Sequence, residues 1–189
     1  FRNKQETAYV VSIEKESSIP KLKEITSLID TIPVLDEDLL RLTKEISEYY
    51  GCTWGEAIAT ALPEPIRRGK RLNITREIPN QDNPLPAQRI LLYDRKGDAR
   101  WDFYLQSISR AIATGGSAII IVPDVSYIFK IKPLLDQKLS ISSTCLYRKQ
   151  PQAAEIWSAL KEGRSKVVIG TRSAIFAPLP NTRLIIVDE

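Results

Sequence analysis

The chain has 189 residues, 43% hydrophobic and 26% charged, a length that can bury the core of one or two domains. It has no His and two Cys, which excludes Ser-His-Asp or Cys-His catalysis and a His-bearing zinc site within these residues. No apolar run approaches the ~18 residues of a membrane span, so we expect a soluble, cytoplasmic protein with no membrane partner. The chain also lacks Met, even at position 1, and we expect it to be a piece of a longer product.

Charge is unevenly spread along the chain, whose formal net charge is +4. Residues 1–63 carry 7 basic and 11 acidic side chains, residues 64–89 carry 6 and 3, and residues 90–189 carry 14 and 9. A basic middle and C-terminal part suits the binding of phosphate backbones, whereas an ordinary solvated surface explains any single charge.

The first elements predicted are a strand and a helix. The apolar, β-branched run at residues 8–13 indicates the strand. Apolar residues then recur at helical spacing from Leu35 to Tyr49. Asp36 is a suitable N-cap for this helix, and Gly51 is a suitable residue to end it.

A second, short helix is predicted to begin at a capping box formed by Thr53 and Glu56. Three aromatic residues, Tyr49, Tyr50 and Trp54, lie on or between these helices. Rings at helical spacing are typical of a core, and exposed rings can stack on bases. Both interpretations stay open from the sequence.

Residues 64–89 are rich in Pro, Asn and Arg and show no apolar period, which predicts a linker. Its basic cluster consists of Arg67, Arg68, Lys70 and Arg71. These side chains either hold phosphate groups of DNA or simply keep the linker soluble.

Strands and helices alternate through residues 90–189. The predicted strands are 90–93, 118–122, 139–146, 167–169 and 184–187, and the predicted helices are 102–114, 126–135 and 151–162. This alternation predicts an α/β domain with a right-handed, mostly parallel sheet, in which the runs 167–169 and 184–187 are central, buried strands.

The acidic pair Asp188 and Glu189 directly follows the last apolar run. Ligands of parallel sheets bind beyond the carboxyl ends of the strands, where segment 170–173 would also project. Carboxylates there either hold Mg²⁺ and orient a water for attack on a phosphate, or are solvated acids at the end of a buried strand.

Several sequence motifs of the lobe resemble those of the primosomal replication-restart proteins (PriA, primosomal protein N′), a superfamily 2 DExH helicase family. These motifs are GTRSAIFAPLPN followed by LIIVDE, and IIIVPDVS. The resemblance covers residues 91–189 nearly unbroken and implies a RecA-like helicase lobe 1 at residues 90–189, truncated at its acidic motif. It also implies DNA, branched or single-stranded, as a partner, primosome or replication proteins as further partners, and association with the nucleoid. Intact members use ATP and Mg²⁺ and carry zinc in a later cysteine-rich region.

The N-terminal part resembles the same family through PKLKEIT and EYYGCTWGEAIATALP. The resemblance implies that residues 1–63 are the C-terminal half of a small α+β domain that captures the 3′ end of DNA. Lys23 matches a family lysine near the terminal nucleotide, whereas Arg2 replaces an expected glycine. Residues 64–89 stand as a basic linker where relatives insert a winged-helix domain.

The family's Walker A loop, GVTGSGKT, is replaced here by DRKGDARW between an intact LLY and an intact YLQ. Such a loop needs glycines whose N–H groups surround phosphates, a Lys for the β and γ phosphates and a Thr for Mg²⁺. Gly97 is the one glycine left, Arg100 replaces the lysine and Trp101 replaces the threonine. We therefore expect a degenerate Walker A loop, no cofactor or metal in this piece, and no ATP hydrolysis.

Two functions remain open from the sequence. In the first, the chain is a DNA-binding protein of replication restart without ATPase or helicase activity, with Asp188 and Glu189 as relics of Walker B. In the second, it belongs to an ATP-dependent 3′→5′ DNA helicase with an unconventional phosphate loop. In both, residues Thr171, Arg172 and Ser173 either contact the DNA backbone or form a structural turn in which the arginine pairs with a nearby acid.

Overall fold

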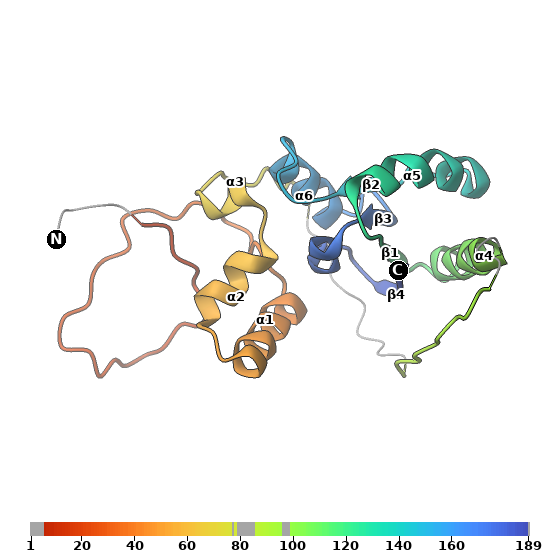
Figure 1. The fold of residues 1–189 in the computed structure, drawn as a ribbon. Coiled ribbons are helices and arrows are strands. Elements are labelled where there is room, and N and C mark those ends of the chain that lie inside the picture. Colours follow the sequence, from red (N-terminus) through yellow and green to blue (C-terminus); the bar gives the residue numbers. More distant parts are fainter. Residues whose placement is uncertain (1–5, 77, 79–85, 96–98, 189) are drawn as a thin grey trace.

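The computed structural model describes residues 6–76, 78, 86–95 and 99–188. Three helices, α1 (Glu37–Tyr50), α2 (Trp54–Ala61) and α3 (Glu64–Arg67), precede a lobe in which strands and helices alternate (Figure 1). The lobe contains α4 (Ala99–Ala113), β1 (Ser117–Ile121), α5 (Val125–Leu139), β2 (Thr144–Leu146), α6 (Ala153–Lys161), β3 (Val167–Gly170), the 3₁₀ helix η1 (Arg172–Phe176) and β4 (Thr182–Val187). Across the described ranges, no helix has the length and apolar character needed to cross a membrane.

The four strands form one parallel sheet in the order β2-β3-β1-β4, which confirms the predicted α/β class. Strands β1 and β3 are buried along their whole length, as continuous apolar runs in a parallel sheet should be. The prediction that β4 is also central is wrong, because β4 lies at an edge of the described sheet. Its Ile185 and Val187 are 49% and 56% exposed.

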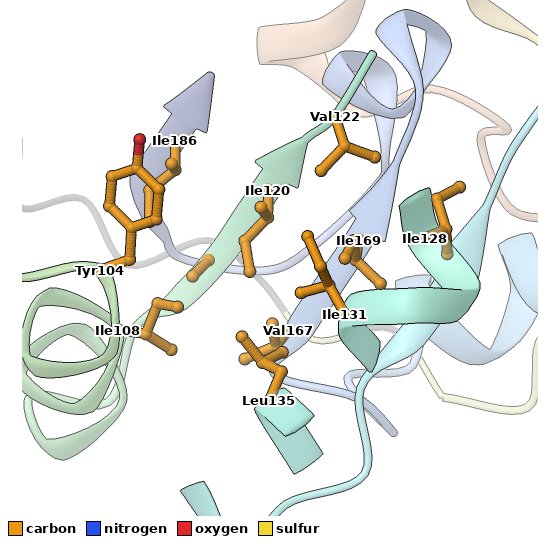
Figure 2. Packing of buried hydrophobic residues seen from close by; sticks show 11 residues of the cluster. Tyr104, Ile108, Ile120, Val122, Ile128, Ile131, Leu135, Val167, Ile169 and Ile186 are labelled. Atoms are coloured by element: carbon orange, nitrogen blue, oxygen red, sulfur yellow. The ribbon is translucent and has the colours of Figure 1, made fainter. Parts of the chain in front are cut away.

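Successive residues of the central strands pack on opposite faces of the sheet, as the pleat of a strand requires. One face is covered by α4 and α5, whose Ile108, Ile131 and Leu135 meet Ile120 and Ile169 (Figure 2). The opposite face carries α6 and η1, which pack on a second cluster of β1 and β3 residues, Ile119, Ile121 and Val168, together with Leu146, Leu160, Ala174, Ala177 and Leu179. The sheet is thus the middle layer of three.

The two predicted N-terminal helices and their caps are confirmed. Asp36 accepts a hydrogen bond from the backbone N–H of Leu39 at 2.8 Å, and Gly51 ends α1 with a φ of 65°. Thr53 and Glu56 form the reciprocal capping box of α2.

The aromatic residues of these helices divide between the two interpretations. Trp54 is half-buried, and its indole N–H donates to the Thr43 hydroxyl at 3.0 Å. Tyr49 and Tyr50 are 83% and 74% exposed, so the core interpretation is wrong for both tyrosines.

Two predicted strands do not form, and a third is shorter than expected. Segment 8–13 is extended and turns Tyr9 and Val11 toward the helices, but no described strand pairs with it. Segment 90–93 is likewise unpaired and largely exposed. The predicted strand 139–146 begins only at Thr144, because α5 continues to Leu139 and ends at Ser140 with a φ of 52°.

Helix α6 joins the N-terminal part to the lobe, and Figure 1 shows it between α3 and the sheet. Its Trp157 is 1% exposed and donates a hydrogen bond to the Val34 carbonyl at 3.3 Å, while buried Lys161 donates to the Pro33 carbonyl. On the other side, Glu162, which follows α6, accepts hydrogen bonds from the N–H and hydroxyl of Thr75 at 2.6 and 2.7 Å. Residues 70–75 are therefore held against the lobe, while the predicted domain boundaries at 63/64 and 89/90 stay a prediction.

Candidate functional site

The carboxyl ends of the four strands meet at one edge of the sheet. The backbone ladder continues past the strands, since Val122 N–H donates to the Gly170 carbonyl at 2.8 Å and Asp188 N–H donates to the Ile121 carbonyl at 2.9 Å. Gly170 has no room for a side chain, because a Cβ atom there would lie 2.0 Å from the Leu146 carbonyl oxygen. This close packing fixes the segments that follow β1, β3 and β4 at the edge where parallel sheets bind ligands.

Asp188 is buried at the β4 end of this edge, with 4% of its surface exposed. The guanidinium Nε of Arg100, on the first turn of α4, forms an ion pair with its Oδ1 at 2.9 Å. The Tyr104 hydroxyl donates a hydrogen bond to the same oxygen at 3.1 Å. Arg100 also donates to the Tyr127 hydroxyl at 3.2 Å, and its backbone N–H donates to Asp94 at 2.9 Å. A cation and a hydroxyl of this chain therefore occupy one oxygen, Oδ1, of the carboxylate at the predicted Walker B position.

The titration behaviour of this cluster follows from its burial and its charges. Burial acts to lower the pKa of Arg100, but the hydrogen bond to Tyr127 and the charge of Asp188 outweigh it, and the pKa lies above its ordinary value. Burial, the negative charge of Asp188 and the hydrogen bond to it raise the pKa of Tyr104 to about 12. The cluster is thus built from a charged arginine, a carboxylate and a neutral phenol at neutral pH.

A magnesium ion with a nucleotide fits these residues poorly. A divalent cation needs carboxylate oxygens free to coordinate it, and Oδ1 of Asp188 already contacts a guanidinium. Trp101, at the position of the expected threonine, packs edge-on against Tyr104 with ring centroids 5.3 Å apart and offers no oxygen ligand. Gly97 and Glu189, the other two predicted residues of this site, lie outside the described residues.

The β3 end of the same edge carries the predicted phosphate contacts Thr171, Arg172 and Ser173. Thr171 precedes η1, Arg172 is exposed, and Ser173 is half-buried. Within the described part of the chain, Arg172 forms no ion pair, which removes the support for the alternative in which it pairs with a nearby acid. The contact of these three residues with DNA stays a prediction.

The basic residues of the linker have different surroundings from one another. Arg68 pairs with Glu64, and Lys70 pairs with Glu155 of α6 at 2.6 Å. Arg67 is half-buried, whereas Arg71 is exposed beside an open cavity of about 210 Å³ between the linker and α6. Lys23 lies exposed in the irregular segment before α1. The contact of Lys23 and of these four cations with DNA stays a prediction.

Sequence reasoning missed two groups of residues at this edge. Tyr104 and Tyr127 were not recognised as partners of the Walker B and Walker A positions, since only the fold brings them there. The second group combines rings with cations on α5 and in the loop after β2, namely Phe129, Lys130, Tyr147, Arg148 and Lys149. The available signal for this second group was the interleaving of aromatic and basic residues in the sequences SYIFK and LYRK.

Comparison with known families gives one match in the N-terminal part. A family model described as the 3′DNA-binding domain (3′BD) of PriA matches residues 1–63. This is the stretch that contains α1, α2 and Lys23.

Curated proteins similar to the chain carry the description "Replication restart protein PriA". The protein of Chlamydia muridarum is 27% identical over 180 residues, covering 94% of this chain and 22% of that protein. The protein of Rickettsia conorii is 25% identical over 207 residues, covering 100% of this chain and 32% of that protein. The protein of Bacillus subtilis is 31% identical over 103 residues, covering 52% of this chain and 12% of that protein. The chain therefore spans less than a third of the length of these relatives.

Proposed function

We propose that this chain, which belongs to the PriA family of replication restart proteins, binds DNA during replication restart and does so without hydrolysing ATP in its α/β lobe. Branched or single-stranded DNA is the proposed substrate, and proteins of the primosome are the proposed partners. In this proposal the lobe is a DNA-binding scaffold that has kept the parallel sheet of a helicase core.

The DNA-binding half of the proposal is supported by two parts of the chain. Residues 1–63 match a 3′DNA-binding domain, and their helices α1 and α2 are well capped. The carboxyl edge of the lobe presents exposed Arg172, which forms no ion pair among the described residues, next to two groups, Thr171 and Ser173, that can donate hydrogen bonds to phosphate. We further propose residues 1–63, 64–89 and 90–189 as the functional divisions of the chain, with the basic linker, including Arg67, Arg68, Lys70 and Arg71, and Lys23 as additional phosphate contacts.

The single observation that carries the absence of ATP turnover is the ion pair between Arg100 and Asp188. To bind Mg²⁺ through Oδ1, Asp188 would have to exchange a guanidinium at 2.9 Å and the Tyr104 hydroxyl for a hydrated metal ion. Magnesium gives up its water reluctantly, so this exchange is unfavourable without further oxygen ligands. Asp188 therefore acts as a structural anchor for α4 in this proposal.

The proposal is tested by measuring DNA binding and nucleotide binding on the same preparation. Fluorescence anisotropy with labelled single-stranded and forked DNA should give saturable binding that weakens steeply with salt. Titration with a fluorescent ATP analogue in the presence of Mg²⁺ should give no saturable signal, and an ATPase assay with DNA should give none above background. The Asp188→Ala variant is the control, because turnover by a contaminant would be the same in both proteins.

Saturable ATP turnover that disappears in Asp188→Ala would overturn the nucleotide-independent function. It would instead support the second function, an ATP-dependent 3′→5′ helicase. Failure of the chain to bind either DNA would overturn the DNA-binding function.

A further inference from the structure

Helix α1 has an apolar stripe that the rest of the described chain covers only in part. This α1 stripe consists of Leu39, Leu42, Ile46 and Tyr49. Its residues recur three and four positions apart, which is the spacing of a helix face that packs against another helix. Tyr49 is 83% exposed and the other three are half-buried, whereas the buried side chains of α1 are the polar Thr43 and Ser47. The α1 stripe therefore leaves apolar surface in contact with water.

Helix α5 carries a second exposed apolar surface, on the side away from the sheet. Phe129 and Leu134 are 57% and 59% exposed, and Pro133 lies exposed between them. Lys130 and Lys138 lie four residues before and four residues after Leu134, so the three side chains are neighbours along one side of the helix. We name this surface the α5 face; it consists of Phe129, Lys130, Pro133, Leu134 and Lys138.

The two helices carry opposite charge. Helix α1 has four acidic and two basic side chains, a net charge of −2, and α5 has three basic and one acidic side chain, a net charge of +2. One ion pair forms within each helix, between Arg41 and Asp38 and between Lys132 and Asp136. The acids left on α1 and the lysines left on α5 are exposed and form no ion pair among the described residues; they are Glu37, Glu45 and Glu48, and Lys130 and Lys138.

The charges beside the two apolar surfaces also match in spacing. Glu37 and Glu45 are eight residues apart, as are Lys130 and Lys138, and eight residues span about 12 Å along a helix. Two helices that pack side by side can therefore bring both acids to both lysines. Pairing α1 with a second α1, or α5 with a second α5, would instead set like charges against each other.

The α1 stripe and the α5 face of one molecule do not reach each other. Figure 1 shows α1 beside α2 on one side of the molecule and α5 on another side of the lobe. The two helices also pack in different hydrophobic clusters, α1 in the one around Trp157 and α5 in the one around Ile120. A contact between the two surfaces must therefore join two copies of the chain. Because the surfaces differ, such a contact is head-to-tail, and it leaves one free surface of each kind for further copies.

We infer that the chain associates head-to-tail with a second copy of itself, the α1 stripe of one copy docking on the α5 face of the next. The stripe covers Phe129 and Leu134 of the neighbouring copy, and the free acids of α1 pair with Lys130 and Lys138. This association goes beyond the proposed function and needs no DNA. On a DNA strand, the same contact would place copies next to one another and make their binding cooperative.

The test is sedimentation velocity of the 189-residue chain, purified free of nucleic acid, over a series of protein concentrations at low and high salt. We expect the weight-average sedimentation coefficient to rise with protein concentration, and to rise less at high salt because surface ion pairs are screened. Two charge-reversal variants, Glu37→Lys/Glu45→Lys and Lys130→Glu/Lys138→Glu, should each associate at least about tenfold more weakly, because like charges then face each other.

Mixing the two variants gives the sharpest result. Each reversed surface meets an opposite charge on the other variant, so an equal mixture should associate like the unchanged chain. A variant that does not fold cannot be rescued in this way. Glu37 also lies in the first turn of α1, where negative charge stabilises the helix. The single variant Glu45→Lys is therefore measured as well, and it should show a smaller loss in the same direction.

Matched controls make the same charge changes elsewhere. Glu14→Lys/Glu16→Lys and Lys15→Glu/Lys21→Glu alter exposed residues of the irregular segment before α1, and association should stay within about twofold of the unchanged chain. Leu134→Ser changes no charge and removes an apolar side chain from the α5 face. We expect it to weaken association roughly fivefold.

The outcomes separate this inference from the proposed function. If the unchanged chain sediments as a monomer at every concentration, or associates only after DNA is added, the inference is wrong, and the DNA-binding function is judged by its own measurement. If the chain associates but the charge-reversal variants behave like their controls, the α1–α5 contact does not join the copies. Two folded variants that each remain monomeric and do not associate when mixed would also overturn the inference.

Discussion

The two ends of the sheet's carboxyl edge differ in how their charged side chains are paired. At the β4 end, the charge of Asp188 is matched by Arg100 and by the Tyr104 hydroxyl of the same chain. At the β2–β3 end, Arg148 and Arg172 are exposed and have no acidic partner within the described residues. A ligand for the first end must displace a buried ion pair, while a ligand for the second end displaces only water and mobile ions. Whether the charge of a motif residue is already paired within the chain is thus a better guide to ligand binding than whether the residue is retained.

Gly170, the last residue of β3, gives the largest expected effect. A Cβ atom at this position would lie 2.0 Å from the Leu146 carbonyl oxygen and 2.5 Å from the Ala174 Cβ. Gly170→Ala must therefore push β2 or η1 away from β3, and we expect a loss of about 3 kcal/mol in the free energy of unfolding. Urea unfolding followed by circular dichroism measures this loss.

The matched control for that prediction is Gly55→Ala in α2, where a Cβ atom meets nothing within 4 Å. Alanine is a better helix former than glycine, so this change should leave stability the same or raise it by up to about 1 kcal/mol. Gly170→Ala with the unfolding midpoint of the unchanged chain would show that β2 and β3 are not closely packed at the edge. The two ends could then not be treated as one continuous edge.

The ion pair between Arg100 and Asp188 at the β4 end gives the second prediction, which is measured as a double-mutant cycle. We expect Arg100→Gln and Asp188→Asn to show a coupling energy of about 1–3 kcal/mol in urea unfolding, because Asp188 is buried and only 26% of the Arg100 side chain is exposed. The control cycle uses Arg41 and Asp38, whose side chains are 71% and 62% exposed, and should give no more than about 0.5 kcal/mol. Equal coupling in both cycles would mean that Asp188 is not held internally.

The titration of Tyr104 reports on its hydrogen bond to Asp188 at the β4 end. Tyr104→Phe removes one hydrogen bond to Asp188 and should cost about 1 kcal/mol of stability at neutral pH. The pKa of Tyr104 is raised from 10.0 to about 12, so the neutral phenol is favoured in the folded chain. This contribution to stability is complete below pH 10 and is lost as the pH rises toward 12.

Tyrosinate absorbance during an alkaline titration checks this behaviour. The unchanged chain should show one tyrosine that ionises near pH 12, and Tyr104→Phe should lack that component. Tyr49→Phe removes an exposed ring instead and should leave the component near pH 12 in place. A Tyr104→Phe titration curve with the high-pH component still present would place the buried phenol elsewhere.

Much of the fold could be predicted from local sequence. Asp36, Gly51 and the Thr53–Glu56 pair identify helix ends because capping needs only residues a few positions apart. The buried strands β1 and β3 were predictable because both of their faces are apolar. Segments 8–13 and 90–93 have the residues of strands but no partner in the described sheet, and a strand exists only through its partner.

In the candidate site, too, single residues could be predicted from the sequence, whereas contacts between distant residues could not. Arg100 and Asp188 were predicted as separate remnants of two motifs, and their contact could not be, because it depends on how α4 lies against β4. Tyr147 and Phe129 come together only through the packing of α5 beside β2. The sequence left open whether Arg172 contacts DNA or pairs with a nearby acid, and only the fold shows that it is exposed and has no acidic partner within the described residues.

The smallest effect is predicted for Asp124, and it tests whether DNA binds at the β2–β3 end of the edge. Asparagine is as good an N-cap as aspartate, so Asp124→Asn should keep α5 and the thermal midpoint unchanged. Removing its negative charge from the N-cap of α5 should strengthen oligo-dT binding about twofold at low salt, and the gain should vanish near 1 M salt. Glu48→Gln removes the same charge from an exposed position on α1 and serves as the control. If both variants gain the same factor, only the net charge of the chain matters, and DNA does not lie preferentially at the β2–β3 end.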